Sequence, residues 1–241
     1  MTIENTSNDF TGPEILKIPE GAFKLIADAM GLEAARNVAL KDALWENRSL
    51  DQYMHFLGFE REDLAGKRVL DIGSGTLRLF ATEASQLGAD VVSLDPMILT
   101  EKWEREFDDD DQLKLERERA IADKESGKLV KAIAQDMPFE SSSFDIIVAL
   151  FSVPAYLPRL GGEVAQTFDE ILRVIKPGGR AYIYPVCTKA KYAGAGYTYV
   201  PEGIVRMIEE ASGHPIRPKI IERSRHPDFG ETIRERMVIK K

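Results

Sequence analysis

Two aspartates around a glycine turn have the types and spacing to bind a nucleoside. Asp71 lies two residues before Gly73, and the turn runs from Gly73 to Gly75. Asp95 follows Gly75 by 20 residues, which is the spacing of a carboxylate that accepts hydrogen bonds from ribose hydroxyls. We therefore expect the two carboxylates and the turn to form one binding site.

The residues after the turn narrow the class of ligand. The chain continues with Leu77 and Arg78, so the third glycine of the dinucleotide-binding pattern is absent. That glycine belongs to the pattern that brings a pyrophosphate close to the backbone. The turn therefore favours a nucleoside ligand without a diphosphate.

A strand before the turn and a helix after it would position these residues. Val69 to Ile72 is a short apolar run suited to a buried parallel strand, and apolar residues recur at helical spacing from Leu77 until Gly88. Ligands of open α/β sheets bind at the carboxyl ends of strands, beside helix N-termini. The predicted site lies at such a point.

Composition excludes several classes of protein. The net charge of −8 argues against a nucleic-acid surface, and no apolar run approaches the ~20 residues of a membrane-spanning helix. The polar N-terminus is unlike a signal peptide. Cys187 is the single cysteine, and the three histidines have no metal-ligand spacing, so we expect no disulfide and no metal site. A cytoplasmic enzyme or binding protein fits best.

Strands and helices alternate along most of the chain. Expected strands are residues 69–72, 90–94, 129–134, 144–150, 180–186, 216–222 and 235–240, and expected helices include 163–175 and 201–211. This alternation predicts an α/β, Rossmann-like, doubly wound and mostly parallel sheet over residues 66–241. Helical patterning at 19–30, 32–45 and 50–57 predicts a helical N-terminal segment over residues 1–65, which could be a cap or simple packing.

Four stretches in this order resemble the class I S-adenosylmethionine-dependent methyltransferases. They are VLDIGSGTLRL, VVSLDPMI, AQDMPFESSSFDIIVALFSV and ILRVIKPGGRAYIY, and they span about half of the chain, from Arg68 to Val186. The resemblance implies a sheet of seven strands with the last strand antiparallel. It also implies S-adenosylmethionine as cofactor, lying across the carboxyl ends of the first four strands.

The resemblance also assigns binding roles by position. Asp71 and the backbone of the turn would face the amino-acid part of the cofactor, and glycine there would leave room for the ligand. Asp95 would hold the ribose hydroxyls. Pro96, Met97 and the segment from Ala134 to Asp136 would contact the adenine, and Leu150 and Phe151 would flank the methionine portion. The implied cofactor-binding residues are thus Asp71, Gly73, Ser74, Gly75, Asp95, Pro96, Met97, Ala134, Gln135, Asp136, Leu150 and Phe151.

Three points stay open at this level. The family usually has a glycine where this chain has Leu77, which could narrow the pocket or shift the cofactor. Ile133 occupies the usual place of the adenine-contacting acid, so either Asp136 serves or only backbone groups contact the adenine. Asp95 could instead cap the helix that follows it.

The sequence says less about which residues would bind the methyl acceptor. Tyr156, Tyr192 and Tyr197 are the candidate substrate-binding residues, and the segment 189–200 could fold over an acceptor or be an exposed loop. Arg48 and Tyr53 could close over the cofactor. No residue can be assigned as catalytic, because transfer from a sulfonium needs little acid–base chemistry.

The predicted function is therefore transfer of a methyl group from S-adenosylmethionine to a small-molecule acceptor, with no nucleic-acid or membrane partner. One alternative is a protein that keeps the methyltransferase fold and binds the cofactor or a partner without catalysis. A second is an NAD-type oxidoreductase, which the missing third glycine disfavours. The acceptor, the atom methylated and the oligomeric state cannot be obtained from the sequence.

Overall fold

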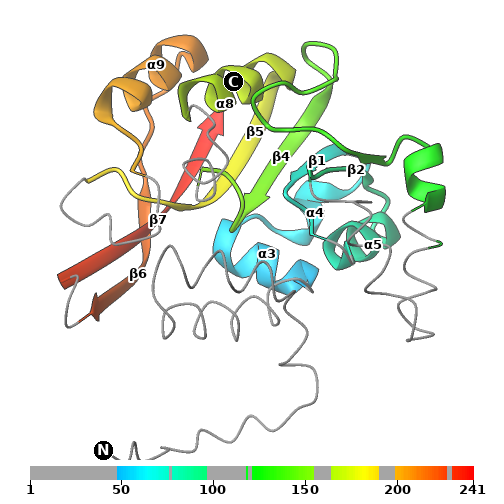
Figure 1. Ribbon diagram of the computed structural model, residues 1–241, viewed down its shortest axis with the longest axis horizontal. Helices are drawn as coiled ribbons and strands as arrows, with labels where there is room; N and C mark the ends of the chain where they lie inside the picture. The colour runs from blue at the N-terminus through cyan, green and yellow to red at the C-terminus, as the bar shows by residue number, and fades with distance from the viewer. Residues whose placement is uncertain are drawn as a thin grey trace, which may run out of the picture. The chain divides into compact units, whose positions relative to one another are not determined.

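The computed structural model describes residues 48–75, 78–96, 118, 121–154, 164–189, 199–226 and 230–241 (Figure 1). Residues 47–241 form one compact unit. The helical runs expected at 19–30 and 32–45 lie outside the described residues, so the proposed N-terminal cap stays a prediction. The same holds for Leu77, Met97, Tyr156, Tyr192 and Tyr197.

A mixed sheet of seven strands forms the centre of the described chain. Its order is β3-β2-β1-β4-β5-β7-β6, with β3 to β5 parallel and β7 antiparallel to both of its neighbours. The predicted seven-stranded sheet with an antiparallel last strand is thus confirmed. The strands are β1 (Arg68–Ile72), β2 (Asp90–Leu94), β3 (Leu129–Val130), β4 (Phe144–Leu150), β5 (Ile175–Val186), β6 (Lys219–His226) and β7 (Gly230–Lys240).

Helices cover both faces of this sheet (Figure 1). They are α3 (Leu50–Leu57), α4 (Arg61–Leu64), α5 (Leu79–Gln86), α8 (Val164–Val174) and α9 (Glu202–Ser212). Helices α8 and α9 contact each other and share a core with alternate residues of the strands, such as Ile72 and Ile183. Helices α3 and α5 contact each other on the opposite face, where Asp71 and Tyr184 point, because side chains alternate along a strand.

Local signals explain where α3 begins and ends. Ser49 accepts a hydrogen bond from the backbone of Gln52, whose side chain accepts one back from Ser49. This reciprocal pair caps the first turn. Gly58 ends the helix in the left-handed conformation, at φ +67°. The helix predicted at residues 50–57 is confirmed.

Four expected strands differ from the structure in their bounds. The strand expected at 216–222 is β6 (Lys219–His226), and the one expected at 235–240 is β7, which begins five residues earlier at Gly230. Strand β3 ends at Val130 instead of residue 134, because the chain turns away there and the Asp136 N–H bonds to the Ile133 carbonyl oxygen. Strand β5 begins at Ile175 and includes the expected turn at 176–179, which forms an irregularity opposite Phe144 and Ile146. None of these differences moves the carboxyl ends of β1, β2 or β4.

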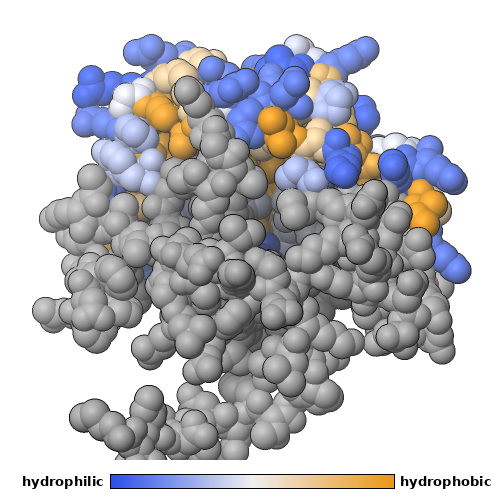
Figure 2. All heavy atoms as spheres, in the orientation of Figure 1, coloured by the Kyte–Doolittle hydropathy of each residue, from blue (hydrophilic) through white to orange (hydrophobic). Residues whose placement is uncertain are grey.

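The described surface is mostly hydrophilic over α8 and α9, with hydrophobic residues in small separate areas (Figure 2). Among the described residues, no helix is long and apolar enough to cross a membrane.

Candidate functional site

The parallel register brings the predicted site residues to one edge of the sheet. Ile72 at the end of β1 pairs with Leu94 at the end of β2, and Leu94 pairs with Val130. Leu150 at the end of β4 pairs with Tyr184. The glycine turn, Asp95 to Pro96 and the chain after Leu150 therefore leave the sheet side by side.

The glycine turn is held tightly between β2 and the chain that follows β4. The Gly73 N–H donates to the Leu94 carbonyl oxygen at 2.7 Å, and Gly73 adopts a φ of +74°. A Cβ at Gly73 would lie 2.2 Å from the Cβ of Ser152, whose hydroxyl donates to the Ile72 carbonyl oxygen at 2.5 Å. The protein itself therefore already requires glycine at position 73, before any ligand is considered.

Asp95 joins the end of β2 to the turn. Its Oδ2 accepts a hydrogen bond from the Gly75 N–H at 3.2 Å. Asp95 and Pro96 are both partly exposed. The helix that Asp95 could have capped falls on residues outside the described chain.

Asp71 is a buried carboxyl with an unused oxygen. Its side chain is 0 % exposed, Oδ1 accepts from the Tyr53 hydroxyl at 2.9 Å, and Oδ2 has no hydrogen-bond partner. Burial raises the pKa of Asp71 to about 7, against the lowering effects of the Tyr53 hydrogen bond and of the Arg78 and Arg48 charges. The nearby charge of Asp95 adds to the rise.

Helix α3 and the chain just before it contribute one residue each to this edge. Tyr53 packs its ring on Phe80 of α5, with ring centroids 4.1 Å apart and planes at 8°. Arg48, just before the helix, donates to the Leu150 carbonyl oxygen and places its guanidinium 5.1 Å from the centre of the Phe151 ring. Both residues that the sequence suggested could close over a cofactor contact residues of the predicted site.

Leu150 and Phe151 are mostly enclosed by protein. Leu150 is 0 % exposed and Phe151 is 4 % exposed. Phe151 takes a φ of +51°, and its N–H donates to the Tyr184 carbonyl oxygen at 2.6 Å. Its ring meets those of Phe56 and Tyr184 edge to face, at 5.3 and 5.1 Å between centroids. The backbone after β4 is thus held by a hydrogen bond to β5 and by ring packing against α3 and β5.

The loop expected to meet the adenine is also fixed. Ala134 and Gln135 are buried, whereas Asp136 is exposed and Ile133 is 46 % exposed. Ala134 belongs to the core cluster that also contains Ile72 and Leu94.

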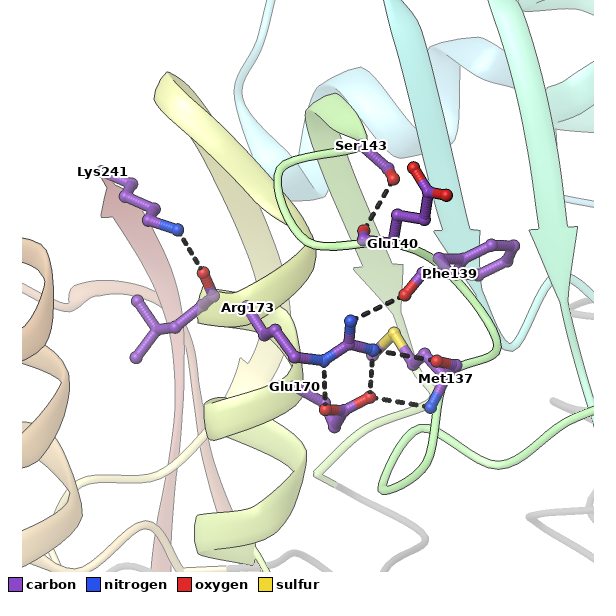
Figure 3. Close-up of polar contacts among 8 residues, drawn as sticks. Met137, Phe139, Glu140, Ser143, Glu170, Arg173 and Lys241 are labelled. Atoms are coloured by element: carbon purple, nitrogen blue, oxygen red, sulfur yellow. Dashed lines mark hydrogen bonds and ion pairs between the residues drawn. The ribbon is translucent and has the colours of Figure 1, made fainter.

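Two residues of α8 hold this loop, and sequence reasoning missed both (Figure 3). Glu170 accepts from the Met137 N–H at 2.8 Å. Arg173 donates to the carbonyl oxygens of Met137 at 2.9 Å and Phe139 at 2.6 Å, and pairs with Glu170. The spacing of Glu170 and Arg173 predicts an ion pair on the helix, but nothing in it identifies the loop as their shared partner.

Arg78 is a further residue that the sequence did not identify as part of the site. It precedes α5 in the left-handed conformation, at φ +49°, and its side chain is almost fully buried. It forms an ion pair with Asp123 and donates to the Lys128 carbonyl oxygen at 3.2 Å. This links the far end of the glycine turn to the chain before β3 and places a positive charge near Asp71.

Asp145 and Cys187 have structural surroundings. Asp145 accepts hydrogen bonds from the Arg68 N–H and from Lys176, both at 2.9 Å. Cys187 is buried, which raises the pKa of its thiol. Within the described ranges, no group of three or more His, Cys, Asp or Glu residues could hold a metal ion.

This arrangement suits a ligand that carries a cationic donor and neighbouring hydroxyls. The buried, unpaired Oδ2 of Asp71 can accept from an ammonium group, and Asp95 can accept from hydroxyls at the edge. The missing third glycine disfavours a pyrophosphate at the turn. The residues therefore fit S-adenosylmethionine better than a dinucleotide.

Comparison with known proteins finds that the central region of the chain is similar to methyltransferases. Residues 70–183 match the methyltransferase domain family. A demethylmenaquinone methyltransferase of Clavibacter sepedonicus is 36 % identical over 121 residues, which are 50 % of this chain and 41 % of that protein. The ubiquinone/menaquinone biosynthesis C-methyltransferase of Idiomarina loihiensis is 30 % identical over 168 residues, which are 66 % of this chain and 58 % of that protein. The matches thus span about half the length of these relatives.

A solved structure agrees with the fold. The S-adenosylmethionine dependent methyltransferase from Mesorhizobium loti superposes with a TM-score of 0.50 at 12 % identity, covering 81 % of this chain and 100 % of that one. At this identity the likeness concerns the fold alone.

Proposed function

We propose that this protein transfers a methyl group from S-adenosylmethionine to a small-molecule acceptor, because residues 70–183 match the methyltransferase domain family and the chain resembles the class I S-adenosylmethionine-dependent methyltransferases. The observation that carries the proposal is the meeting of Asp71, the glycine turn and Asp95 at one edge of the parallel sheet. The unpaired Oδ2 of Asp71 there would accept a hydrogen bond from the amino group of that cofactor.

The chain's residues would bind and orient the cofactor. Asp95 accepts hydrogen bonds from the two ribose hydroxyls, and Asp71 accepts one from the ammonium group. Ala134 and Gln135 contact the adenine, and the backbone after Leu150 flanks the methionine portion. Met97 and Asp136 remain predicted adenine contacts.

The cofactor supplies an electrophilic methyl group on a sulfonium, whose departure leaves a neutral thioether. The protein then needs chiefly to hold the acceptor in line with that methyl group, because proximity and orientation alone can supply several kcal/mol of the barrier reduction. A base is required only for an acceptor that must lose a proton. This accounts for a site whose described residues include binding groups and no evident catalytic pair.

The acceptor is proposed as a small organic molecule. The curated relatives are named as methyltransferases of demethylmenaquinone and of ubiquinone and menaquinone biosynthesis, which supports this class. Tyr156, Tyr192 and Tyr197 remain the predicted acceptor-binding residues.

Ligand binding tests the proposal directly. S-adenosylmethionine and its demethylated product, S-adenosylhomocysteine, should each raise the melting temperature of the protein, and NAD should not. A rise with NAD alone would refute the proposal. Binding without methyl transfer to any acceptor in a broad screen would favour the non-catalytic alternative.

The ribose contact gives a sharper test. Asp95→Ala should weaken S-adenosylhomocysteine binding at least about tenfold, because a hydrogen bond to a charged group contributes about 1.5–3 kcal/mol. Asp95→Asn keeps an oxygen that accepts from the Gly75 N–H. It therefore preserves the contact that supports the turn and removes only the charge that would bind the ribose hydroxyls. Asp169→Ala, at an exposed carboxylate on α8, is the matched control and should bind normally. Unchanged affinity in both Asp95 variants would show that Asp95 does not hold the ribose.

A further inference from the structure

Only one of the two oxygens of the Asp71 carboxyl has a hydrogen-bond partner. Tyr53 donates to Oδ1 at 2.9 Å, while the buried Oδ2 has no partner. Leaving a buried polar atom unpaired is costly, and more so for a charged group. A ligand that brings a donor to Oδ2 would remove this cost.

Tyr53 is held in place independently of Asp71. Its side chain is 1 % exposed and its ring is stacked on Phe80. Helix α3 is capped by Ser49, and its first backbone N–H donates to Glu83 of α5 at 2.5 Å. The Tyr53 hydroxyl therefore has a fixed position, and the side chain of Asp71 orients to it.

Four groups facing Asp71 set its charge. Arg48 and the Tyr53 hydroxyl lie on the α3 side, Arg78 lies at the start of α5, and Asp95 lies at the end of β2. Burial raises the pKa of Asp71 most; the first three groups lower it and Asp95 raises it further, which leaves the pKa at about 7. Loss of the Tyr53 hydroxyl would raise this pKa and leave less of Asp71 ionised at neutral pH.

We propose that Tyr53 is a positioning residue for cofactor binding: it orients Asp71 so that the second carboxyl oxygen receives the ammonium group at the amino-acid end of S-adenosylmethionine. This inference rests on the proposed function, since it takes that cofactor as the ligand. It also makes α3 part of the cofactor site, although Tyr53 precedes the residues that match the family.

Calorimetric titration with two ligands tests the role of Tyr53. S-adenosylhomocysteine carries the amino-acid end, whereas 5′-methylthioadenosine has the same nucleoside without it. Both are titrated into the wild type and Tyr53→Phe from about pH 6 to about pH 8.5, a range that spans the pKa of Asp71. Tyr182→Phe is the matched control, because Tyr182 is a buried tyrosine on the same face that packs on Phe59 and whose hydroxyl meets Arg180.

Tyr53→Phe should weaken S-adenosylhomocysteine binding about fivefold at pH 7. A rise of one pH unit in the pKa of Asp71 would lower its ionised fraction from about a half to about a tenth. The difference from wild type should shrink as the pH rises, because Asp71 then ionises in both proteins. Binding of 5′-methylthioadenosine should not change, and Tyr182→Phe should behave as wild type with both ligands.

A second variant keeps the geometry and removes the charge. Asp71→Asn retains an acceptor for Tyr53, so its binding of S-adenosylhomocysteine should be weak and nearly independent of pH over this range. Equal affinity and equal pH dependence in wild type and Tyr53→Phe would overturn the inference. So would an equal weakening of both ligands, which indicates a general structural role. A wild type that binds neither ligand would instead overturn the proposed function.

Discussion

Replacing Asp71 with asparagine should remove a large pH dependence from the stability of the ligand-free protein. The pKa of Asp71 is raised from 3.8 to about 7 by burial. The folded chain therefore binds this proton more tightly than the unfolded chain. The stabilising effect is fully present below about pH 4 and is lost as the pH rises through about 7.

The size of the effect follows from proton linkage. Between about pH 5 and pH 8, a carboxyl with these two pKa values lowers the free energy of unfolding by about 2.5 kcal/mol. Asparagine at position 71 still accepts from Tyr53 but cannot ionise. The pH dependence of the wild type should therefore exceed that of Asp71→Asn by about this amount, whatever the variant's absolute stability.

Urea unfolding of both ligand-free proteins at the two pH values measures the difference. Other titrating groups are common to the two proteins and cancel when the pH effects are subtracted. Wild type and variant that lose stability equally between the two pH values would refute the reasoning. Such a result would mean that Asp71 is not a buried carboxyl with one unpaired oxygen.

Two further substitutions test how the site is supported. Gly73→Ala should lower the free energy of unfolding by about 2–5 kcal/mol, because it combines a left-handed φ with a clash on Ser152. In a Ser152→Gly background the same change should cost clearly less. An equal cost in both backgrounds would contradict the clash. Arg173→Gln should lower the free energy of unfolding by about 1–3 kcal/mol, since Arg173 is partly exposed but holds two loop carbonyls. Urea unfolding measures both, and Arg206→Gln, in an exposed ion pair with Glu202, should show no measurable change.

The sequence predicted the parts of this fold that depend on local patterns. Continuous apolar runs located β1, β2 and β4, and a capping serine with a terminal glycine located α3. The order of strands and glycine turn then placed Asp71 and Asp95 at the same sheet edge. These features depend on residues close together in the chain, where spacing carries the information.

The contacts that hold the site depend on residues far apart, and local spacing does not indicate them. Tyr53 meets Asp71 across 18 positions, and Arg78 meets Asp123 across 45. Arg173 reaches back 36 positions to Met137. Each pairing results from sheet register and helix packing, which form only in the complete fold. The early end of β3 has the same origin, since its residues are apolar enough to continue a strand.

The place of β7 between β5 and β6 has a consequence for synthesis of the protein. Among the described strands, β6 pairs only with β7, which the ribosome makes later. Until residues 230–240 emerge, β6 has no partner and the edge of β5 that will receive β7 is open. The first five strands can therefore assemble during translation, whereas this half of the sheet can close only afterwards.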